Sequence, residues 1–260
     1  MHGRSLALTS AVLVGASAVL AQQDPAAKAL VAKARAALGG ETRLAALQSF
    51  VIKGTIAVGD GPTKDFGSFT VHGRFPDAFV RYRLVSPVGD AGGAATAPTT
   101  TTFKPNGVNG SLNRYATRIG FDGGKLIYEP SIQTYQVKDL GPAVPEQIQQ
   151  LYANAQRECL PLTLGLFVTS LAGIPVRFVD PQGNQLEAIN GPGPSLIMTL
   201  DPKTGAPVRV GDLVFEDRRD VAGVKVPFRI IRMVGSHRHE TWDVKEFQID
   251  VPIPASVFRD

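Results

Sequence analysis

Apolar residues near the start of the chain recur on one face of a helix. The stripe consists of Leu30, Val31, Ala34, Ala37 and Leu38. This spacing is typical of an amphipathic helix. Asp24 and Pro25 precede it as a cap and a first helical residue,, and the glycines at 39 and 40 favour its end. A second, short helix is predicted from Glu41 to Gln48.

From Ser49 the pattern alternates at every second residue, which is typical of antiparallel strands with one dry and one wet face. Phe69 and Val71 alternate with polar residues, and Val80, Tyr82 and Leu84 alternate with arginines. We therefore expect these five side chains to form one dry surface. Further strands are predicted at 115–121, 184–190, 195–200, 206–215, 224–234 and 240–251, with glycine-containing turns between them,.

Two other segments interrupt the strands. Residues 145–157 have the pattern of a helix, and the strongly apolar segment from Leu160 to Leu171 fits either a buried helix or a flap over apolar surface,. Residues 86–111 are rich in glycine, alanine and threonine, which predicts a long mobile loop,.

These elements predict a mainly β fold with some α-helix. About ten strands and two helical excursions favour a strongly curved antiparallel sheet, an open half-barrel wrapped around short helices. No linker, charge run or repeat divides the sequence, so residues 22–260 are expected to form a single domain.

The first 21 residues have the order of an export signal. Arg4 precedes an apolar run, and Val19 and Ala21 provide the small residues that signal peptidase requires,. The run is shorter than a spanning helix needs, so we predict cleavage after Ala21, a periplasmic location and no stable transmembrane anchor. The alternative is an uncleaved N-terminal anchor.

Composition and charge narrow the function classes. The formal net charge of +4 is small and its basic residues are scattered, which argues against a nucleic-acid partner. Cys159 is the only cysteine, so no internal disulfide forms, and its apolar surroundings predict an inert buried thiol. The charges at 217–220 are interpreted as turn and edge-strand charges.

Sequence motifs for catalysis or metal binding are incomplete. Residues 120–125, GFDGGK, end like a phosphate loop but lack its first glycine and its Ser/Thr, so a hairpin turn is favoured,. His237 and His239 could share a metal with His72, but the ligand number is too small, and a solvated hairpin turn is favoured,. We predict no catalytic residues, no metal site and no cofactor.

Several segments together resemble the outer-membrane lipoprotein-sorting family, the LolA/LolB-like periplasmic carriers and their uncharacterised relatives. The segments are 32–56, with a helix ending at a double glycine before the first strand, and 74–84, 119–130, 199–210 and 217–230. Two departures are Ile127-Tyr128, where relatives often carry tryptophan, and the insertion at 86–111. The resemblance implies an open half-barrel around helices, with an apolar cavity for acyl chains.

Three functions remain open. The first is a non-catalytic carrier or binder of an acyl chain, a lipoprotein or another apolar ligand; the second is an interaction module that holds an envelope protein; the third is an unrecognised hydrolase. For the first, the predicted cavity residues are Phe69, Val71, Val80, Tyr82, Leu84, Phe167, Leu171, Leu196, Met198 and Trp242. The alternative for Leu164, Phe167 and Leu171 is that they complete a filled core.

Overall fold

A computed structural model describes residues 25–59, 65–86, 115–123, 125–129, 145–171, 176–189 and 195–259. Its helices are α1 (Pro25–Leu38), α2 (Glu41–Ala45), α3 (Pro145–Phe167) and the short 3₁₀ helix η2 (Ala255–Phe258). Its strands are β1 (Ser49–Val58), β2 (Asp65–Arg74), β3 (Ala78–Ser86), β4 (Tyr115–Asp122), β5 (Lys125–Glu129), β6 (Arg177–Gln182), β7 (Gln185–Ile189), β8 (Leu196–Leu200), β9 (Pro207–Val210), β10 (Leu213–Val221), β11 (Val224–Val234) and β12 (His237–Ile249).

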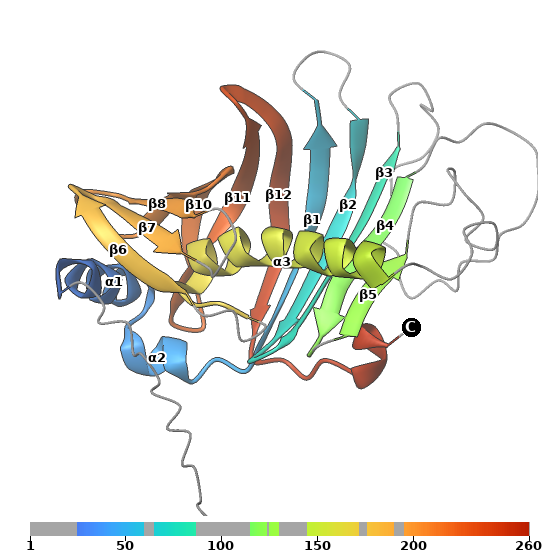
Figure 1. Cartoon of the computed structure of the whole chain (residues 1–260), viewed down its shortest axis with the longest axis horizontal. Coiled ribbons are helices and arrows are strands. Elements are labelled where there is room, and N and C mark those ends of the chain that lie inside the picture. The colour runs from blue at the N-terminus through green and yellow to red at the C-terminus, as the bar shows by residue number, and fades with distance from the viewer. Residues whose placement is uncertain are drawn as a thin grey trace, which may run out of the picture.

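All twelve strands belong to one antiparallel sheet that does not close on itself. Their order is β5-β4-β3-β2-β1-β12-β11-β10-β9-β8-β7-β6. Two meanders, β1–β5 and β6–β12, therefore meet where the first and last strands pair at the centre (Figure 1). This arrangement confirms the predicted open, mainly β fold.

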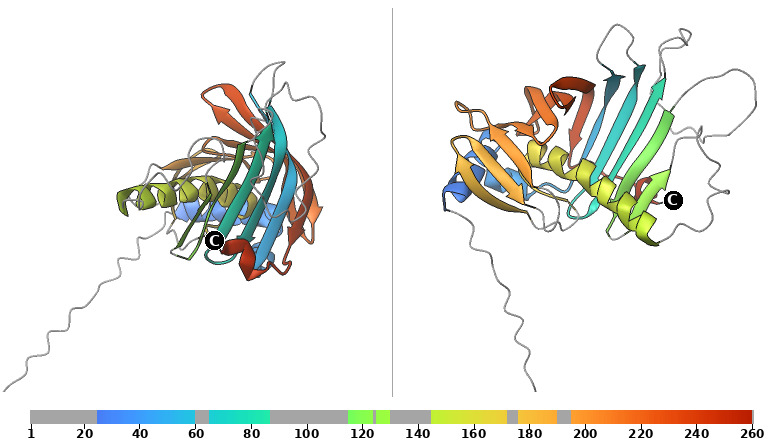
Figure 2. Two further views of the ribbon diagram at one scale, coloured as in Figure 1. Left: turned by 90° about the vertical axis from the view of Figure 1, so that its right-hand side faces the viewer. Right: turned by 45° about the horizontal axis from the view of Figure 1, so that its top comes forward.

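Helix α3 connects the two meanders and crosses one face of the sheet (Figures 1 and 2). It contacts β4 and β5 towards one end and β9 and β10 towards the other. We call the face on which α3 lies the inner face and the opposite one the outer face. The two segments predicted at 145–157 and 160–171 form this one helix up to Phe167, with Pro161 inside it. The buried-helix interpretation of the second segment is thus correct as far as Phe167.

Close contact between α3 and the sheet depends on Gly165. A Cβ atom at this position would lie 2.0 Å from Cζ of Phe215 on β10, which is too close for any side chain. Arg218 holds the same turn of α3, because its guanidinium donates to the Gly165 carbonyl at 3.0 Å and also to the Lys225 carbonyl. Burial lowers the pKa of Arg218 to about 10. Arg218 thus points inward, unlike the surface charges predicted at 217–220.

Several local predictions are confirmed. Helix α1 has the predicted bounds, and Gly39 and Gly40 at its end have positive φ angles. Asp122 pairs with Lys125 across a tight hairpin, and Val234 pairs with His237 across another, so GFDGGK and the histidine cluster both lie at turns. The single strand predicted at 206–215 is instead two strands, because Gly211 adopts φ 58° in a turn between β9 and β10.

Other predictions fall partly or wholly outside the described residues. The export signal at 1–21 and nearly all of the loop predicted at 86–111 lie there, although Ser86 itself ends β3. Within the described ranges, no helix is both long and apolar enough to span a membrane. The same ranges hold no group of three or more histidine, cysteine or acidic residues arranged to bind a metal.

Candidate functional site

Cross-strand register decides which predicted cavity residues face α3. On β2, Phe69 and Val71 pair with Arg83 and Arg81 of β3, so these four side chains share one face. Arg81 forms an ion pair with Glu158 of α3, which identifies this face as the inner one. Phe69 and Val71 are therefore inner-face residues, as the cavity prediction requires.

Val80, Tyr82 and Leu84 point the other way. Val80 pairs with His72, and Tyr82 pairs with Thr70, so the expectation of one dry surface shared with Phe69 and Val71 is not met. The C-terminal segment explains why apolar residues occupy the outer face of β3. Val80 packs in a small cluster with Phe258, and the Tyr82 hydroxyl donates to the carbonyl of Val257 at 3.3 Å.

The other predicted cavity residues lie in the main core. Phe167 and Leu171 are completely buried, Met198 lies on the inner face of β8, and Leu196 packs partly buried beside the same core. The ring of Phe167 lies among Phe50, Phe75 and Phe247, at centroid distances of 5.2, 5.9 and 6.4 Å. For Phe167, this packing favours the filled-core alternative.

Trp242 and Phe69 form the apolar part of the candidate site. Trp242 of β12 is buried on the inner face, and its ring centroid lies 5.0 Å from that of Phe69. Arg81 and Arg232 both lie against the indole, with Cζ atoms 5.6 and 5.8 Å from its centroid. Cations at this distance interact favourably with an indole ring, so the tryptophan orients both guanidinium groups.

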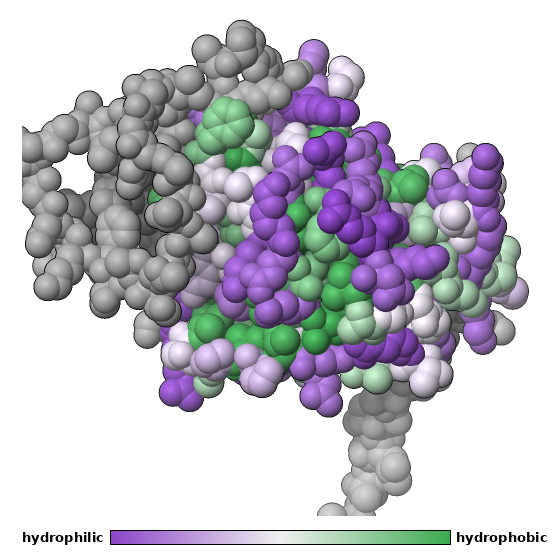
Figure 3. Space-filling model, turned by 180° about the vertical axis from the view of Figure 1, so that it is seen from behind, coloured by the Kyte–Doolittle hydropathy of each residue, from purple (hydrophilic) through white to green (hydrophobic). Residues whose placement is uncertain are grey.

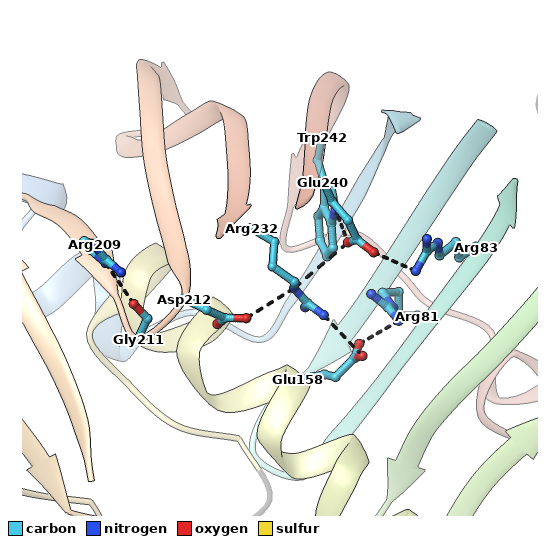
Figure 4. Close-up of polar contacts among 9 residues, drawn as sticks. All are labelled: Arg81, Arg83, Glu158, Arg209, Gly211, Asp212, Arg232, Glu240 and Trp242. Atoms are coloured by element: carbon cyan, nitrogen blue, oxygen red, sulfur yellow. Dashed lines mark hydrogen bonds and ion pairs between the residues drawn. The ribbon is translucent and has the colours of Figure 1, made fainter. Parts of the chain in front are cut away.

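Five charged side chains gather around Trp242, and we call them the inner-face cluster: Arg81 and Arg83 from β3, Glu158 from α3, Arg232 from β11 and Glu240 from β12 (Figure 4). Strands β3 and β11 are separated by three other strands, so in a flat sheet they would be roughly 19 Å apart. Curvature of the sheet and the intervening helix bring the arginines of both strands to the carboxylate of Glu158.

The two carboxylates bridge the three arginines. Arg81 Nη2 lies 2.8 Å from Glu158 Oε2, and Arg232 Nη1 lies 3.6 Å from Glu158 Oε1. Arg83 Nη1 lies 2.7 Å from Glu240 Oε1, and the Trp242 indole N–H donates to Glu240 Oε2 at 3.0 Å. Glu240 is thereby fixed from both sides.

Electrostatics favour the ionised form of Glu240. Burial alone would raise the pKa of Glu240, but Arg83, Arg232 and the indole N–H outweigh it and hold that pKa below its ordinary value. Burial lowers the pKa of Arg81, and Glu158 opposes this effect. An arginine nevertheless stays protonated at neutral pH. The cluster is therefore a set of fixed charges beside an apolar wall, and solvent still reaches Arg83, Glu158 and Arg232, whose side chains are 23, 22 and 17% exposed.

Sequence reasoning named Trp242 as a site residue but missed all five members of the inner-face cluster. Arg81 and Arg83 alternate with apolar residues, which predicted a wet outer face for them. Glu240 follows the histidines that were interpreted as a solvated hairpin turn and begins the strand predicted at 240–251, yet it is almost completely buried. The alternation around Arg81 and Arg83 predicted the strand correctly but not the face on which the arginines lie. That face depends on which distant segments cover each side of the sheet.

Cys159 and the histidines are the remaining residues that the sequence analysis considered, as a thiol and as metal ligands. Cys159 is fully buried on α3, and burial raises the pKa of its thiol, which fits the predicted buried thiol. His239 is exposed at the start of β12, whereas His72 is on the outer face of β2, where its ring meets Tyr82 edge-on.

His72 predicts a pH dependence of stability. Burial, with a contribution from Lys53, lowers the pKa of His72 from 6.5 to about 4. The unfolded chain binds this proton more readily, so stability is full above pH ~6.5 and falls as the pH drops towards ~4. The loss should be on the order of 2 to 3 kcal/mol.

Urea denaturation at a series of pH values measures this effect. The His72→Phe variant should show a flatter profile between pH ~6.5 and ~4 than the wild-type protein. His239→Phe, at an exposed position, is the control and should leave the profile unchanged. Equal slopes in the wild-type protein and His72→Phe would contradict the assignment.

Comparisons with known proteins bear on the architecture. No protein-family model and no curated protein matches the sequence. Similar solved structures include a LolA superfamily protein from Nitrosomonas europaea, a putative outer membrane lipoprotein-sorting protein domain from Vibrio parahaemolyticus and a DUF1329 family protein from Desulfovibrio piger. Identities are 11, 6 and 10%, and each match covers 90% of this chain and 97% of the other, with a TM-score of 0.43. The first two matches are to the family that the sequence resembles.

Proposed function

We propose that this protein is an exported envelope protein that binds an acyl chain or another apolar ligand on its inner face, without catalysing a reaction. One observation carries the proposal. Trp242 and Phe69 form an apolar wall on the inner face, directly beside charged groups that solvent still reaches. This combination suits a ligand with a long apolar part, because the wall can contact the chain while the charged rim remains hydrated.

The energetics of such a ligand are favourable. Each buried methylene contributes about 0.8 kcal/mol, so a chain of about fifteen would contribute roughly 12 kcal/mol. That gain is comparable with the association cost of roughly 4 to 15 kcal/mol. A fatty acyl chain is therefore long enough to bind, whereas a short apolar molecule is not.

A second candidate function is an interaction module that holds an envelope protein. Phe66 lies on the outer face of β2 and is 58% exposed. Apolar patches interrupt the hydrophilic rows of that face (Figure 3). Exposed apolar surface of this kind occurs at protein-binding sites. This function predicts a partner on the outer face and no ligand on the inner face.

Native mass spectrometry of the protein purified from its own cell envelope tests the proposal. The expected species begins at Gln22, as cleavage after Ala21 requires, and carries stoichiometric acyl lipid that organic extraction releases. A chain that retains Met1 would contradict the export signal. A ligand-free chain whose extract holds no lipid would contradict the binding function and favour the interaction module.

A further inference from the structure

We infer that the ligand of the inner face carries an anionic head group, and that Arg81 binds this group. The inference rests on the proposed function and specifies the chemistry of the ligand. Its starting point is Arg81, whose side chain is 94% buried, since only 6% is exposed. Of its nitrogens, Nε and Nη1 are buried and have no hydrogen-bond partner.

Unpartnered buried donors are costly, particularly on a charged group. The 2.8 Å contact of Arg81 Nη2 with Glu158 Oε2 is an ion pair without hydrogen-bond geometry, because Glu158 Oε2 also lacks a hydrogen-bond partner. A guanidinium has five N–H donors in a planar fork. Most of the hydrogen-bonding capacity of Arg81 is therefore unused within the described part of the chain.

The neighbouring charges do not compensate Arg81 fully. Three guanidinium groups face two buried or half-buried carboxylates, those of Glu158 and Glu240. The next carboxylate, Asp212, is 48% exposed and lies 3.5 Å from Arg232 Nε, and that nitrogen also lacks a hydrogen-bond partner. Near Trp242, the inner-face cluster thus has one positive charge in excess of its carboxylates.

An anionic head group would balance this excess positive charge, whereas a neutral head group would not. A carboxylate or phosphate accepts strong, charge-assisted hydrogen bonds from a guanidinium, and Arg81 Nε and Nη1 both lack an acceptor. The indole of Trp242 lies 5.6 Å from Arg81 Cζ, so a chain attached to the head group would reach the apolar wall directly. The site would therefore recognise both ends of an anionic amphiphile.

Glu158 determines how the head group enters. Its carboxylate already contacts Arg81 and Arg232, and it would repel an incoming anion. Because Arg81 Nε and Nη1 have no contact with solvent, the head group must displace Glu158 or shift α3. Neutralising Glu158 should therefore strengthen binding of an anion, whereas neutralising Arg81 should weaken it.

The experiment compares anthroyloxy-stearic acid with its methyl ester, using the fluorescence of each probe to measure its affinity. Wild-type protein should bind the acid about tenfold or more tightly than the ester, as expected for hydrogen bonds to a charged group. Arg81→Gln should remove this preference and leave ester binding intact. Glu158→Gln should increase it, and Arg209→Gln, at an exposed position on β9, should not change it.

The possible outcomes separate failure of this inference from failure of the proposed function. Equal affinities of the wild-type protein for acid and ester, or a preference that survives Arg81→Gln, would overturn the inference and leave the proposed function standing. Absence of binding for both probes would contradict the proposed function itself. If thermal unfolding shows that Arg81→Gln does not fold, Glu158→Gln decides: weaker or unchanged acid binding overturns the inference.

Discussion

Replacing Phe167 by alanine is expected to lower the free energy of unfolding by about 3 to 5 kcal/mol. The ring of Phe167 is completely buried, and it contacts the rings of Phe50, Phe75 and Phe247 near the end of α3. Removing it leaves a cavity that rings from β1 and β12 cannot easily fill, because both strands are held in the centre of the sheet. Chemical denaturation of the two proteins measures the difference.

Phe66→Ala is the matched control for this substitution. Phe66 belongs to the same sheet but is mostly exposed, so its loss should change the free energy of unfolding by less than about 1 kcal/mol. The folded Phe167→Ala protein should still bind acyl probes, because Phe167 packs in the core and Trp242 forms the site. A loss of stability similar to that of Phe66→Ala would contradict the described packing.

Replacing Glu240 by alanine should lower the free energy of unfolding by about 3 to 5 kcal/mol, the usual cost of removing one partner from a buried ion pair. Glu240 is 2% exposed and accepts from Trp242 while it pairs with Arg83. Without it, only Glu158 and the more exposed Asp212 would face the three arginines of the inner-face cluster. Denaturation at neutral pH measures the loss.

Glu246→Ala is the control, because Glu246 lies on the same strand and pairs with Lys53 at 3.0 Å with both side chains well exposed. Exposed pairs contribute about 0 to 1 kcal/mol, so this variant should remain close to the wild-type protein. If Glu240→Ala were equally mild, the carboxylate would not hold the arginines together in the way described.

The local patterns of the sequence predicted the elements well. The apolar stripe before Gly39 gave α1, alternation located β2 and β3, and β11 has the predicted bounds. These periods are properties of single elements, so they are visible without knowledge of any contact partner. The resemblance to the lipoprotein-sorting family implied an open half-barrel around helices, and the sheet is indeed open, with α3 on its inner face.

The faces and the pairings of those strands were harder to predict from the sequence. Val80 and Tyr82 are covered by residues near position 257, and this distant contact decides that Arg81 faces α3. The pairing of β1 with β12 joins segments almost 200 residues apart, since Phe50 pairs with Ile249. An alternating strand contains no local signal for such contacts, so sequence reasoning placed the arginines on the wrong face and overlooked the cluster.

The most direct test of ligand binding on the inner face uses Trp242, the only tryptophan of the chain. Bromine quenches indole fluorescence at contact distance, so dibromostearate should quench Trp242 saturably at one ligand per protein, and unbrominated stearate should compete. The expected result is strong quenching in the wild-type protein. Binding of stearate without quenching by its brominated form would place the ligand elsewhere, and no binding of either would contradict the proposed function.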